Sequence, residues 1–587
     1  MRQPGRQRTS RAGQHGEHRS GSDDDHRRSR PPPRAPGGPL STAPHAVTLA
    51  DVSFAWADGA LLLDGVSGTF GRGRTGLIGA NGAGKSTLLR LIAGELTPTA
   101  GSVTTHGRVG HLRQGVLLRK DAQVSDLLGI RSPLDAVRAI EAGSTSPQNY
   151  EAVGDRWDIA AEASAALDEA GLGRIDLDRR VGTLSGGEGI AVALIGLRLA
   201  EAQIALLDEP TNNLDSRARG QLLDLVADWK RTMIVVSHDV RLLNAMDATA
   251  DLRDGALEFF GGTYDAYTEH LALEQAAAEQ QLRTSEQELR TEKRQRIEAE
   301  TKLARRQRYA KTDYRNKRKP KTVMRQRATE AQVSAGKHRG LLDDRVEAAE
   351  LAVAAGESRV RRDVRIHLDL PDPDVPAGRA LLRLDAGDFT TELRGPERLA
   401  LLGDNGVGKT RLLEGLVAGR SPHGTLFTDR VGYLPQRREL ADETGTVLAA
   451  VSAVAPHRTG GELRSNLARL GLRGEAAERQ VAGLSGGERF RVALARLLLA
   501  EPPHQLLLLD EPTNDLDLAT IDVLVQALEA YRGGLVVVSH DDGFLERLGI
   551  GTWIELSGLG CPRFRAARQD GSARSTAPTS PPTGSPR

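Results

Sequence analysis

Two glycine-rich segments each end in a lysine followed by a hydroxyl residue, a pattern that suits phosphate binding. They are Gly79-Ala-Asn-Gly-Ala-Gly-Lys-Ser86 and Gly403-Asp-Asn-Gly-Val-Gly-Lys-Thr410. Glycines let backbone N–H groups converge on phosphate oxygens at a helix N-terminus, where the helix dipole also favours an anion. Each lysine would neutralise β- and γ-phosphates, and each hydroxyl would bind Mg²⁺. The predicted nucleotide contacts are Gly79, Asn81, Gly82, Gly84, Lys85, Ser86 and Thr87, and Gly403, Asn405, Gly406, Gly408, Lys409 and Thr410.

Acidic pairs and histidines farther along the chain provide groups that phosphate hydrolysis needs. The pairs are Asp208-Glu209 and Asp510-Glu511, which end apolar runs, and the histidines are His238 and His540, each in a Ser-His-Asp segment. The aspartates are predicted metal ligands, together with the hydroxyls of the phosphate loops. The glutamates would polarise a water for in-line attack on a γ-phosphate, and the histidines would steady that water or the leaving phosphate.

These motifs occur twice in the same order, so the chain contains an internal duplication. Between each phosphate loop and its acidic pair lies a Leu-Ser-Gly-Gly-Glu segment, at Leu184–Glu188 and at Leu484–Glu488. Short Val, Leu and Ile runs that precede polar turns alternate with helical stretches, which is typical of buried parallel strands in an α/β sheet. Functional residues are then expected at the strand ends. The sequence predicts two α/β nucleotide-binding domains, at 46–265 and 378–556.

The segment between the two copies, 266–377, is rich in Glu, Ala, Gln, Arg and Lys, which is the composition of long helices. One sparse apolar stripe consists of Leu282, Leu289, Ile297 and Ala304, and another consists of Leu342, Val346, Ala349, Val353 and Val360. Such stripes predict two helices that pack against each other as an antiparallel hairpin. Its turn is expected near 312–322, where Pro320 interrupts the pattern.

Basic residues dominate the predicted hairpin tip, where Asp313 is the one acid between Lys302 and Arg327. A basic patch attracts a phosphate backbone, and tyrosines within it can stack on exposed bases. A charge run is more often only a solvated helix face, but here the acids vanish at the tip while the stems mix both signs. The predicted RNA contacts are Arg308, Tyr309, Lys311, Tyr314, Arg315, Lys317, Arg318, Lys319 and Lys321.

The composition of the chain excludes several classes of site and predicts where the protein acts. The formal net charge of +1 says nothing about partners, and the single cysteine, Cys561, excludes an intramolecular disulfide or a cysteine-based metal cluster. No segment reaches about 18 uninterrupted apolar residues, so we expect neither a membrane span nor an ordinary secretion signal, and a cytoplasmic protein is predicted. The ends of the chain, 1–45 and 557–587, are rich in Arg, Gly, Ser and Pro and are predicted to be disordered.

The motifs together resemble those of ATP-binding cassette ATPases over about 46–265 and 378–556. The resemblance implies ATP and Mg²⁺ as ligands, and it implies that Gln114 and Gln436 sense the γ-phosphate and reach the metal. It also implies that the cassettes close head to tail, each Leu-Ser-Gly-Gly-Glu signature covering the nucleotide on the opposite phosphate loop. The signature contacts would be Ser185, Gly186, Gly187 and Glu188, and Ser485, Gly486, Gly487 and Glu488. Trp56 is placed to stack on adenine, and no aromatic residue matches it before Lys409.

Tandem cassettes joined by a charged helical hairpin resemble the ABC-F family, and Phe259-Phe-Gly-Gly-Thr-Tyr264-Asp-Ala-Tyr267 looks like the entry to that family's linker. The resemblance implies a monomeric ATPase that binds the ribosome, with rRNA and tRNA near the exit site as partners and the linker approaching the peptidyl-transferase centre. Ribosomal protection that confers antibiotic resistance is the favoured role. The alternatives are a general translation factor for stalled ribosomes and the ATP-hydrolysing subunit of a drug exporter.

The two copies are not equal. Arg489-Phe-Arg491 follows the second signature, as the family pattern expects, whereas Gly189-Ile-Ala191 follows the first. Because the first signature would cover the Lys409 site, we expect that site to bind or hydrolyse ATP differently. The stretch between glutamine and signature is only 22 residues longer in the first copy. This is too little for the large arm of the translation-throttle members of the family, which favours the resistance members.

Overall fold

The computed structural model describes residues 46–115, 119–212, 214–253, 255–315, 321–359, 370–386, 389–436, 445–557 and 563–568. The tail 1–45, predicted to be disordered, lies outside these residues. In the described part of the chain, no helix is both long and apolar enough to cross a bilayer.

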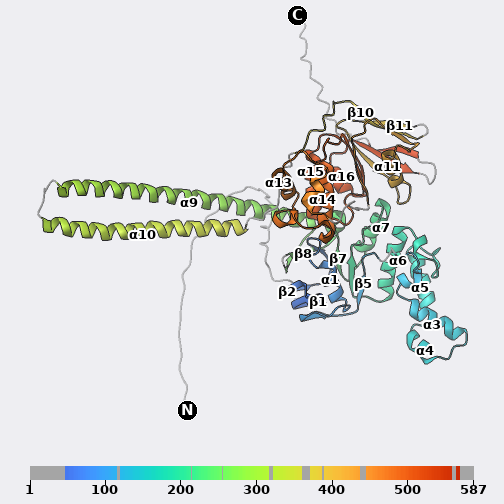
Figure 1. Cartoon of the computed structure of the whole chain (residues 1–587). Coiled ribbons are helices and arrows are strands. Elements are labelled where there is room, and N and C mark those ends of the chain that lie inside the picture. Colours follow the sequence, from blue (N-terminus) through green and yellow to red (C-terminus); the bar gives the residue numbers. More distant parts are fainter. Residues whose placement is uncertain are drawn as a thin grey trace, which may run out of the picture. The chain divides into compact units, whose positions relative to one another are not determined.

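The first cassette is built on a six-stranded sheet in which five neighbouring strands are parallel (Figure 1). In spatial order the strands are β5 (Val109–Leu112), β6 (Ile204–Asp208), β7 (Thr232–Val236), β3 (Arg74–Ile78), β8 (Ala248–Arg253) and the antiparallel β9 (Ala256–Phe260). Every residue of β6 and β7 is buried, as expected for central strands covered on both faces. The predicted α/β fold is therefore confirmed.

A smaller antiparallel sheet and a set of helices complete this cassette. The sheet has the order β2 (Leu61–Phe70), β1 (Val47–Ala55) and β4 (Ala100–Thr105). Its apolar face, together with α1 (Lys85–Ile92), closes a core against the central sheet. The helical part contains α2 (Val124–Leu127), α3 (Arg131–Glu141), α4 (Pro147–Val153), α5 (Ile159–Glu169), η2 (Val181–Thr183) and α6 (Gly186–Leu199). The remaining helices are α7 (Ser216–Ala227) and α8 (Val240–Asn244).

The second cassette repeats this plan. Its main sheet has the order β14 (Val431–Leu434), β15 (Leu506–Asp510), β16 (Gly534–Val538), β12 (Arg398–Leu402), β17 (Thr552–Ser557) and β18 (Arg563–Arg568). Its antiparallel sheet has the order β11 (Phe389–Arg394), β10 (Ala380–Ala386) and β13 (Gly424–Leu426). Its helices are α11 (Lys409–Val417), α12 (Val447–Ser452), α13 (Gly460–Arg469), η3 (Gly474–Ala477), η4 (Val481–Gly483), α14 (Gly486–Leu498), α15 (Leu518–Ala530) and α16 (Asp542–Arg547).

The extra length of the first cassette corresponds to its helical part. There α3 and α4 pack against each other through a small apolar cluster that includes Ala136, Val137 and Val153. The second cassette has α13 as its only α-helix between α12 and the signature among the described residues. The insertion is thus a short helical pair, in keeping with the small length difference.

The prediction that 557–587 is disordered is wrong for one segment. Arg563–Arg568 form β18, which pairs antiparallel with β17 at the edge of the sheet. A single edge strand gains backbone hydrogen bonds from its neighbour and needs no apolar core of its own, so composition alone did not reveal it. The equivalent strand β9 holds the same edge position in the first cassette. Residues 558–562 and 569–587 lie outside the described part of the chain.

Two long helices connect the cassettes and run side by side (Figure 1). They are α9 (Tyr264–Arg315) and α10 (Lys321–Arg359), which confirms the predicted hairpin. Leu342 and Val346 of α10 are buried against α9, and ion pairs Lys293–Glu350 and Arg296–Asp343 cross between the helices at 2.8 and 3.1 Å. The segment 316–320, which includes Pro320, lies outside the described residues.

The stripe predicted for the first helix is wrong beyond Leu289. Ile297 is 64% exposed and Ala304 is also exposed, whereas Arg296 and Leu303 are half-buried. A helix turns about 100° per residue, so the step of eight from Leu289 to Ile297 rotates the side chain about 80° off the seam, and a step of seven stays within about 20° of it. The contact face therefore passes through a charged residue that the apolar pattern did not include. On α10, Val360 lies outside the described residues.

The base of α9 is anchored by aromatic residues. Tyr267 is buried, and its hydroxyl donates a hydrogen bond of 2.8 Å to Asp251 Oδ2 of β8. Tyr267 forms a small apolar cluster with Ile78 and Leu243, and Phe260, Tyr264 and Leu518 pack against this cluster. Because Leu518 begins α15 of the second cassette, the foot of the hairpin touches both cassettes.

Candidate nucleotide-binding sites

Each phosphate loop connects a buried central strand to a helix. Between β3 and α1, Gly84 stands before the helix with φ of 97°, a left-handed conformation that favours glycine. A Cβ on Gly79 would lie 2.4 Å from the carbonyl oxygen of Leu252, so this position also requires glycine. Lys85 Nζ donates to the carbonyls of Gly79 and Ala80 at 2.7 and 3.0 Å. The loop thus surrounds a buried ammonium at the N-terminus of α1.

The second loop has the same geometry. Gly408 has φ of 106° before α11, and a Cβ on Gly403 would lie 2.3 Å from the carbonyl oxygen of Leu556. Lys409 Nζ donates to the carbonyls of Gly403 and Asp404 at 2.6 and 3.1 Å. It also lies 2.9 Å from Nε2 of His540. Burial lowers the pKa of both lysines, against the opposing effect of nearby carboxylates.

The acidic pair of the first cassette lies at the carboxyl end of β6. Asp208 Oδ1 accepts a hydrogen bond of 3.1 Å from the hydroxyl of Ser86. Glu209 has φ of 48°, a strained conformation for a residue other than glycine, of the kind found at functional sites. Its Oε1 lies 3.1 Å from Nε2 of His238. Strand and turn thus direct a carboxylate and an imidazole toward the same space.

Burial controls the protonation of this pair. Burial raises the pKa of Glu209 to about 8, although the Lys85 ammonium opposes the rise. Burial also lowers the pKa of His238 to about 3, and the same ammonium lowers it further. The imidazole is therefore neutral near pH 7. A neutral ring can accept a hydrogen bond at one nitrogen and donate one at the other while it carries no charge.

The second cassette repeats this arrangement. Glu511 has φ of 47°, and its Oε1 lies 3.4 Å from Nε2 of His540. Burial raises the pKa of Glu511 to about 7, opposed by Lys409 and by Arg219 of the first cassette. Burial likewise lowers the pKa of His540 to about 4. The influence of Arg219 shows that a charge from the other cassette reaches this site.

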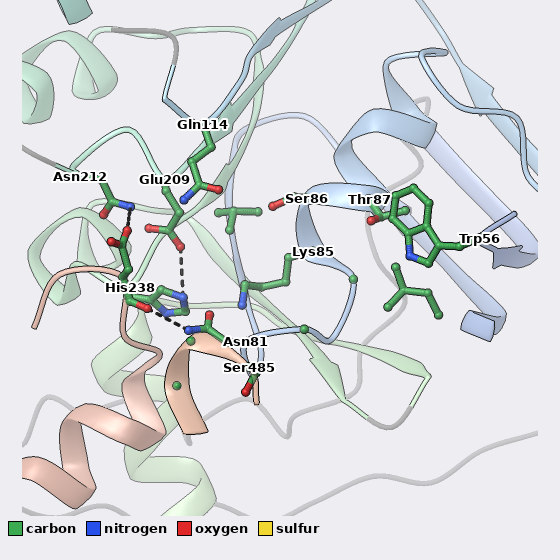
Figure 2. Close-up of a pocket in the computed structure, with 17 residues that line it drawn as sticks. Trp56, Asn81, Lys85, Ser86, Thr87, Gln114, Glu209, Asn212, His238 and Ser485 are labelled. Carbon is green, nitrogen blue, oxygen red and sulfur yellow. Dashed lines mark hydrogen bonds and ion pairs between the residues drawn. The ribbon is translucent and has the colours of Figure 1, made fainter. Parts of the chain in front are cut away.

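A cavity of about 490 Å³ brings most of the first set of predicted residues together (Figure 2). Its walls include Trp56, Asn81, Gly82, Gly84, Lys85, Ser86, Thr87, Gln114, Glu209 and His238 from the first cassette, and Ser485, Gly486 and Gly487 from the second. In Figure 2, Trp56 stands at the opposite end of the cavity from His238 and Glu209. Trp56 is 41% exposed and packs edge-on against Phe54. A nucleotide has an aromatic ring at one end and phosphates at the other, which this distribution of side chains fits.

Hydrogen bonds join the two cassettes beside this cavity. The backbone N–H of Asn81 donates to Asp517 Oδ2 at 2.8 Å, and its side-chain amide donates to the carbonyl of Asp515 at 3.1 Å. The Asn212 amide donates to Asp515 Oδ1 at 3.2 Å. Asn212, Asp515 and Asp517 belong to the segments Asn212-Asn-Leu-Asp215 and Asn514-Asp-Leu-Asp517, which were not among the predicted site residues. Their matched positions after each acidic pair were the available signal.

The two signatures share one local structure. Ser185 and Ser485 each cap a helix by accepting from the backbone N–H of Glu188 or Glu488, whose carboxylate accepts from the serine N–H in return. In the second cassette Glu488 also pairs with Arg479. The glutamates therefore hold the signature turn, with Ser185 and Ser485 exposed and Gly187 and Gly487 buried.

The arginines that follow the second signature contact their own cassette. Arg489 donates to the carbonyl of Ala482 at 2.9 Å, and Arg491 donates to that of Gly471 at 3.4 Å. Gly189 and Ala191, at the matching positions of the first signature, have no side chain that could make such bonds. The first signature segment is therefore less tied to the helices around it.

The second set of predicted residues is only partly brought together. Asp510, Glu511, Thr410 and His540 surround Lys409, whereas Gln436 is exposed at the end of β14. Ser185 and Gly186 line a cavity of about 300 Å³ with Gln114, Asp208 and Asp515, and this cavity does not include Lys409. From the first cassette it is Asp215 whose charge acts on Lys409.

The metal ligands predicted for each site fit Mg²⁺ bound with a nucleotide. Within the described residues, no group of three or more His, Cys, Asp or Glu side chains could hold a metal alone. Mg²⁺ is usually held by one or two carboxylates together with substrate phosphates and water, so one aspartate and one hydroxyl per site suffice. Asp510 is buried beside the hydroxyl of Thr410, so the second site also brings one carboxylate and one hydroxyl together for a cation.

Of the predicted RNA contacts, only Arg308 and Tyr309 have described side chains. Tyr309 is 63% exposed on α9, and the Arg305 guanidinium lies 5.9 Å from its ring centroid. For Lys311, Tyr314, Arg315 and Lys321 the structure describes only the helical backbone. Lys317, Arg318 and Lys319 lie outside the described residues.

Comparison with known proteins supports this description. The ABC transporter family matches residues 63–212 and 387–514. The tylosin resistance ATP-binding protein TlrC of Streptomyces fradiae is 34% identical over 524 residues, covering 82% of this chain and 92% of TlrC. The energy-dependent translational throttle protein EttA of Mycobacterium tuberculosis is 30% identical, covering 83% and 87%. ATP-binding cassette sub-family F member 3 of Mus musculus is 29% identical, covering 89% and 71%.

Among solved structures, an archaeal ribosome recycling factor, aABCE1, bound to the stalk protein aP1 has the same tandem fold. The TM-score is 0.51 at 21% identity, over 88% of this chain and 89% of that one. At this identity the likeness concerns the fold alone. The duplicated cassettes, the helical hairpin between them and the relatives that match most of the chain lead to one conclusion: the chain belongs to the ABC-F family of tandem ATP-binding cassette proteins.

Proposed function

We propose that this chain is an ATPase whose two cassettes close over ATP and that it acts on the ribosome through its helical hairpin. The observation that carries the ATPase proposal is the cavity that combines the Lys85 phosphate loop with Ser485, Gly486 and Gly487 of the other cassette. ATP bound there would touch both cassettes, so its binding would favour closure, and its hydrolysis would remove contacts that hold them together.

The chemistry follows from the side chains around each phosphate loop. Lys85 and Lys409 neutralise phosphate charge, and Glu209 and Glu511 orient and polarise the attacking water. His238 and His540, held neutral by burial, position that water or the leaving phosphate. Gln114 and Gln436 reach the γ-phosphate and metal from the ends of β5 and β14. Bound Mg²⁺ would neutralise the charge that develops on the phosphates.

The hairpin is the part that reaches the ribosome. Its stems carry charges of both signs, in ion pairs such as Lys293–Glu350. Around its tip, the charged residues in the sequence are almost all basic. A basic tip bearing tyrosines suits contact with rRNA and with tRNA near the exit site. At the other end, Tyr264 packs near Leu518 of the second cassette, so closure can be transmitted to the hairpin.

Protection of the ribosome against an antibiotic is the role we favour. TlrC is named as a tylosin resistance protein, and it covers most of this chain. The short insertion at α3 and α4 also argues against a throttle-type factor. A general translation role is the second candidate function, because the similar protein EttA is named as a translational throttle. In either role the protein would act in the cytoplasm as a monomer, with the domain limits predicted above. A drug-exporter subunit would have no use for a basic hairpin.

Ribosome binding is tested with a variant that binds ATP but hydrolyses it poorly, Glu209→Gln with Glu511→Gln. Lysate containing this variant is sedimented through sucrose with ATP, with ADP or with neither. We expect co-migration with ribosomes only with ATP. Recovery with membranes and not with ribosomes would overturn the proposal in favour of an exporter subunit. Drug challenge of cells that express the wild-type protein separates resistance, in which growth is rescued for one drug class, from general translation.

A further inference from the structure

Arg219 connects the two histidine segments across the interface between the cassettes. It lies on the first turn of α7, which begins directly after Asp215. Its Nη1 donates a hydrogen bond of 3.1 Å to the carbonyl oxygen of His540 in the second cassette. The same Nη1 lies 3.5 Å from Oδ2 of Asp239, the residue after His238 in its own cassette. The Arg219 and Asp239 side chains are only 17% and 12% exposed, so water screens this contact weakly.

The carbonyl that accepts from Arg219 belongs to the residue that faces the reacting groups of the second site. His540 Nε2 lies 3.4 Å from Glu511 and 2.9 Å from Lys409 Nζ. A donor on this carbonyl restrains the backbone that aims the imidazole. A second ion pair joins the same two segments, because Arg241 lies 2.6 Å from Asp542. Both bonds exist only when the first cassette is in place against the second.

The contact has no counterpart on the other side among the described residues. Arg219 follows Asp215 by four positions, and the residue four positions after Asp517 is Ile521, which is buried in the core of its own cassette. At the first site, the second cassette instead contributes Asp517, which accepts from the backbone of Asn81 in the phosphate loop. Each site thus has the matching aspartate of the opposite cassette nearby, Asp517 at the Lys85 site and Asp215 at the Lys409 site. Among the described residues, the guanidinium of Arg219 on the histidine segment is a contribution that distinguishes the Lys409 site.

We propose that Arg219 is a positioning residue, supplied by the first cassette, for ATP hydrolysis at the Lys409 site. Through Asp239 it also ties that site to the histidine segment of the Lys85 site, so that hydrolysis at Lys409 depends on closure of the first cassette. The inference rests on the proposed ATPase function and deepens it. Arg219 acts through the His540 backbone, so its loss should slow turnover more than it weakens ATP binding.

The test uses variants in which one site is left to hydrolyse ATP. Glu209→Gln leaves the Lys409 site, and Glu511→Gln leaves the Lys85 site. Adding Arg219→Ala to the first background should lower kcat about tenfold, as expected for loss of a hydrogen bond from a charged donor, with KM changed less than about twofold. In the second background kcat should change less than about twofold. Arg219→Lys should recover part of the activity of the Lys409 site. Arg217→Ala, an exposed position on the same helix, is the matched control.

A second measurement separates positioning from simple support of the interface. ATP-driven closure is followed by energy transfer between dyes on cysteines at Glu162 and Arg420, exposed positions on the two cassettes, in a Cys561→Ser background. Arg219→Ala should close to the same end point. Lost closure, or an equal loss of kcat in both single-site backgrounds, would overturn the inference. Absence of ATP hydrolysis in the wild-type protein would instead overturn the proposed function itself.

Discussion

The groups proposed for catalysis lie in similar electrostatic surroundings in the two cassettes. Each strand-end glutamate is buried, stands in a left-handed conformation and contacts a neutral histidine. The strain and the burial both cost stability, and the regular structure around each site must offset them. Loss of these groups should therefore impair hydrolysis more than folding. The surroundings of the two glutamates differ, since only Glu511 is influenced by an arginine of the opposite cassette in the described structure.

Single replacements of the two glutamates should have unequal effects. Each of Glu209→Gln and Glu511→Gln removes the carboxylate proposed as general base, a contribution worth about 10²- to 10⁴-fold at its own site. Because the signatures and the trans contacts differ between sites, total steady-state ATP turnover should fall by clearly different factors in the two variants. Equal residual turnover, measured at saturating ATP, would show that the two sites are functionally equivalent.

Trp56 should contribute to ATP binding at the Lys85 site. Stacking of a base on an aromatic ring is worth about 1–3 kcal/mol, so Trp56→Ala should weaken ATP binding there about tenfold. Binding is measured by titration of the Glu209→Gln, Glu511→Gln background. Trp157→Ala, which alters another exposed tryptophan, is the control and should leave affinity unchanged. Unchanged affinity in Trp56→Ala would exclude the adenine contact.

The buried histidines should make stability depend on pH. Their pKa values of about 3 and about 4 lie below the ordinary 6.5, so the unfolded chain takes up protons more readily. The stability that they confer is present above about pH 6.5 and is lost as the pH falls toward 4. The midpoint temperature of thermal unfolding should therefore fall more between pH 7 and pH 5 in the wild type than in a His238→Gln, His540→Gln variant. An equal loss in both proteins would contradict this.

For the two helices of the hairpin, the pattern of residue types predicts part of the structure but not all of the helix contacts. Its existence, its two helices and the α10 seam of Leu342, Val346 and Ala349 could be predicted from composition and spacing. The α9 seam beyond Leu289 could not, because it passes through Arg296, which is half-buried and pairs with Asp343. Ile297, the more obvious apolar residue, points away. The spacing of apolar residues predicts the helix, but in a long charged helix ion pairs also determine which face forms contacts.

Charge at the hairpin tip should decide ribosome binding. Reversal to Glu at Arg315, Lys317 and Arg318 replaces attraction to phosphate with repulsion, so ATP-dependent co-sedimentation with ribosomes should be lost. Basal ATPase activity should persist, since these residues are remote in sequence from every site motif. Reversal at Arg290 and Arg294, exposed on the α9 stem, is the matched control and should preserve most of the binding. Loss of binding in the stem control alone would place the RNA contact elsewhere.

The whole molecule consists of two copies of one cassette, and hydrogen bonds across their interface join them. The phosphate loops, acidic pairs, histidines and signatures could all be predicted, because each is a contiguous motif at a strand or helix end. The trans contacts of Asp515, Asp517 and Arg219 could not, since they arise only when residues 300 or more positions apart meet across the interface. Those contacts, together with the foot of the hairpin near Leu518, are what would couple ATP hydrolysis to movement of the hairpin.

We propose that ATP-driven closure places the hairpin tip in the tRNA and peptidyl-transferase region of the ribosome. Electron cryo-microscopy of ribosomes with the Glu209→Gln, Glu511→Gln variant and ATP tests it most directly. We expect ATP between each phosphate loop and the opposite signature, and we expect the tip around Tyr309 and Arg315 to lie beside tRNA and rRNA. A bound complex in which the hairpin points into solvent, or in which the cassettes hold no ATP between them, would contradict it.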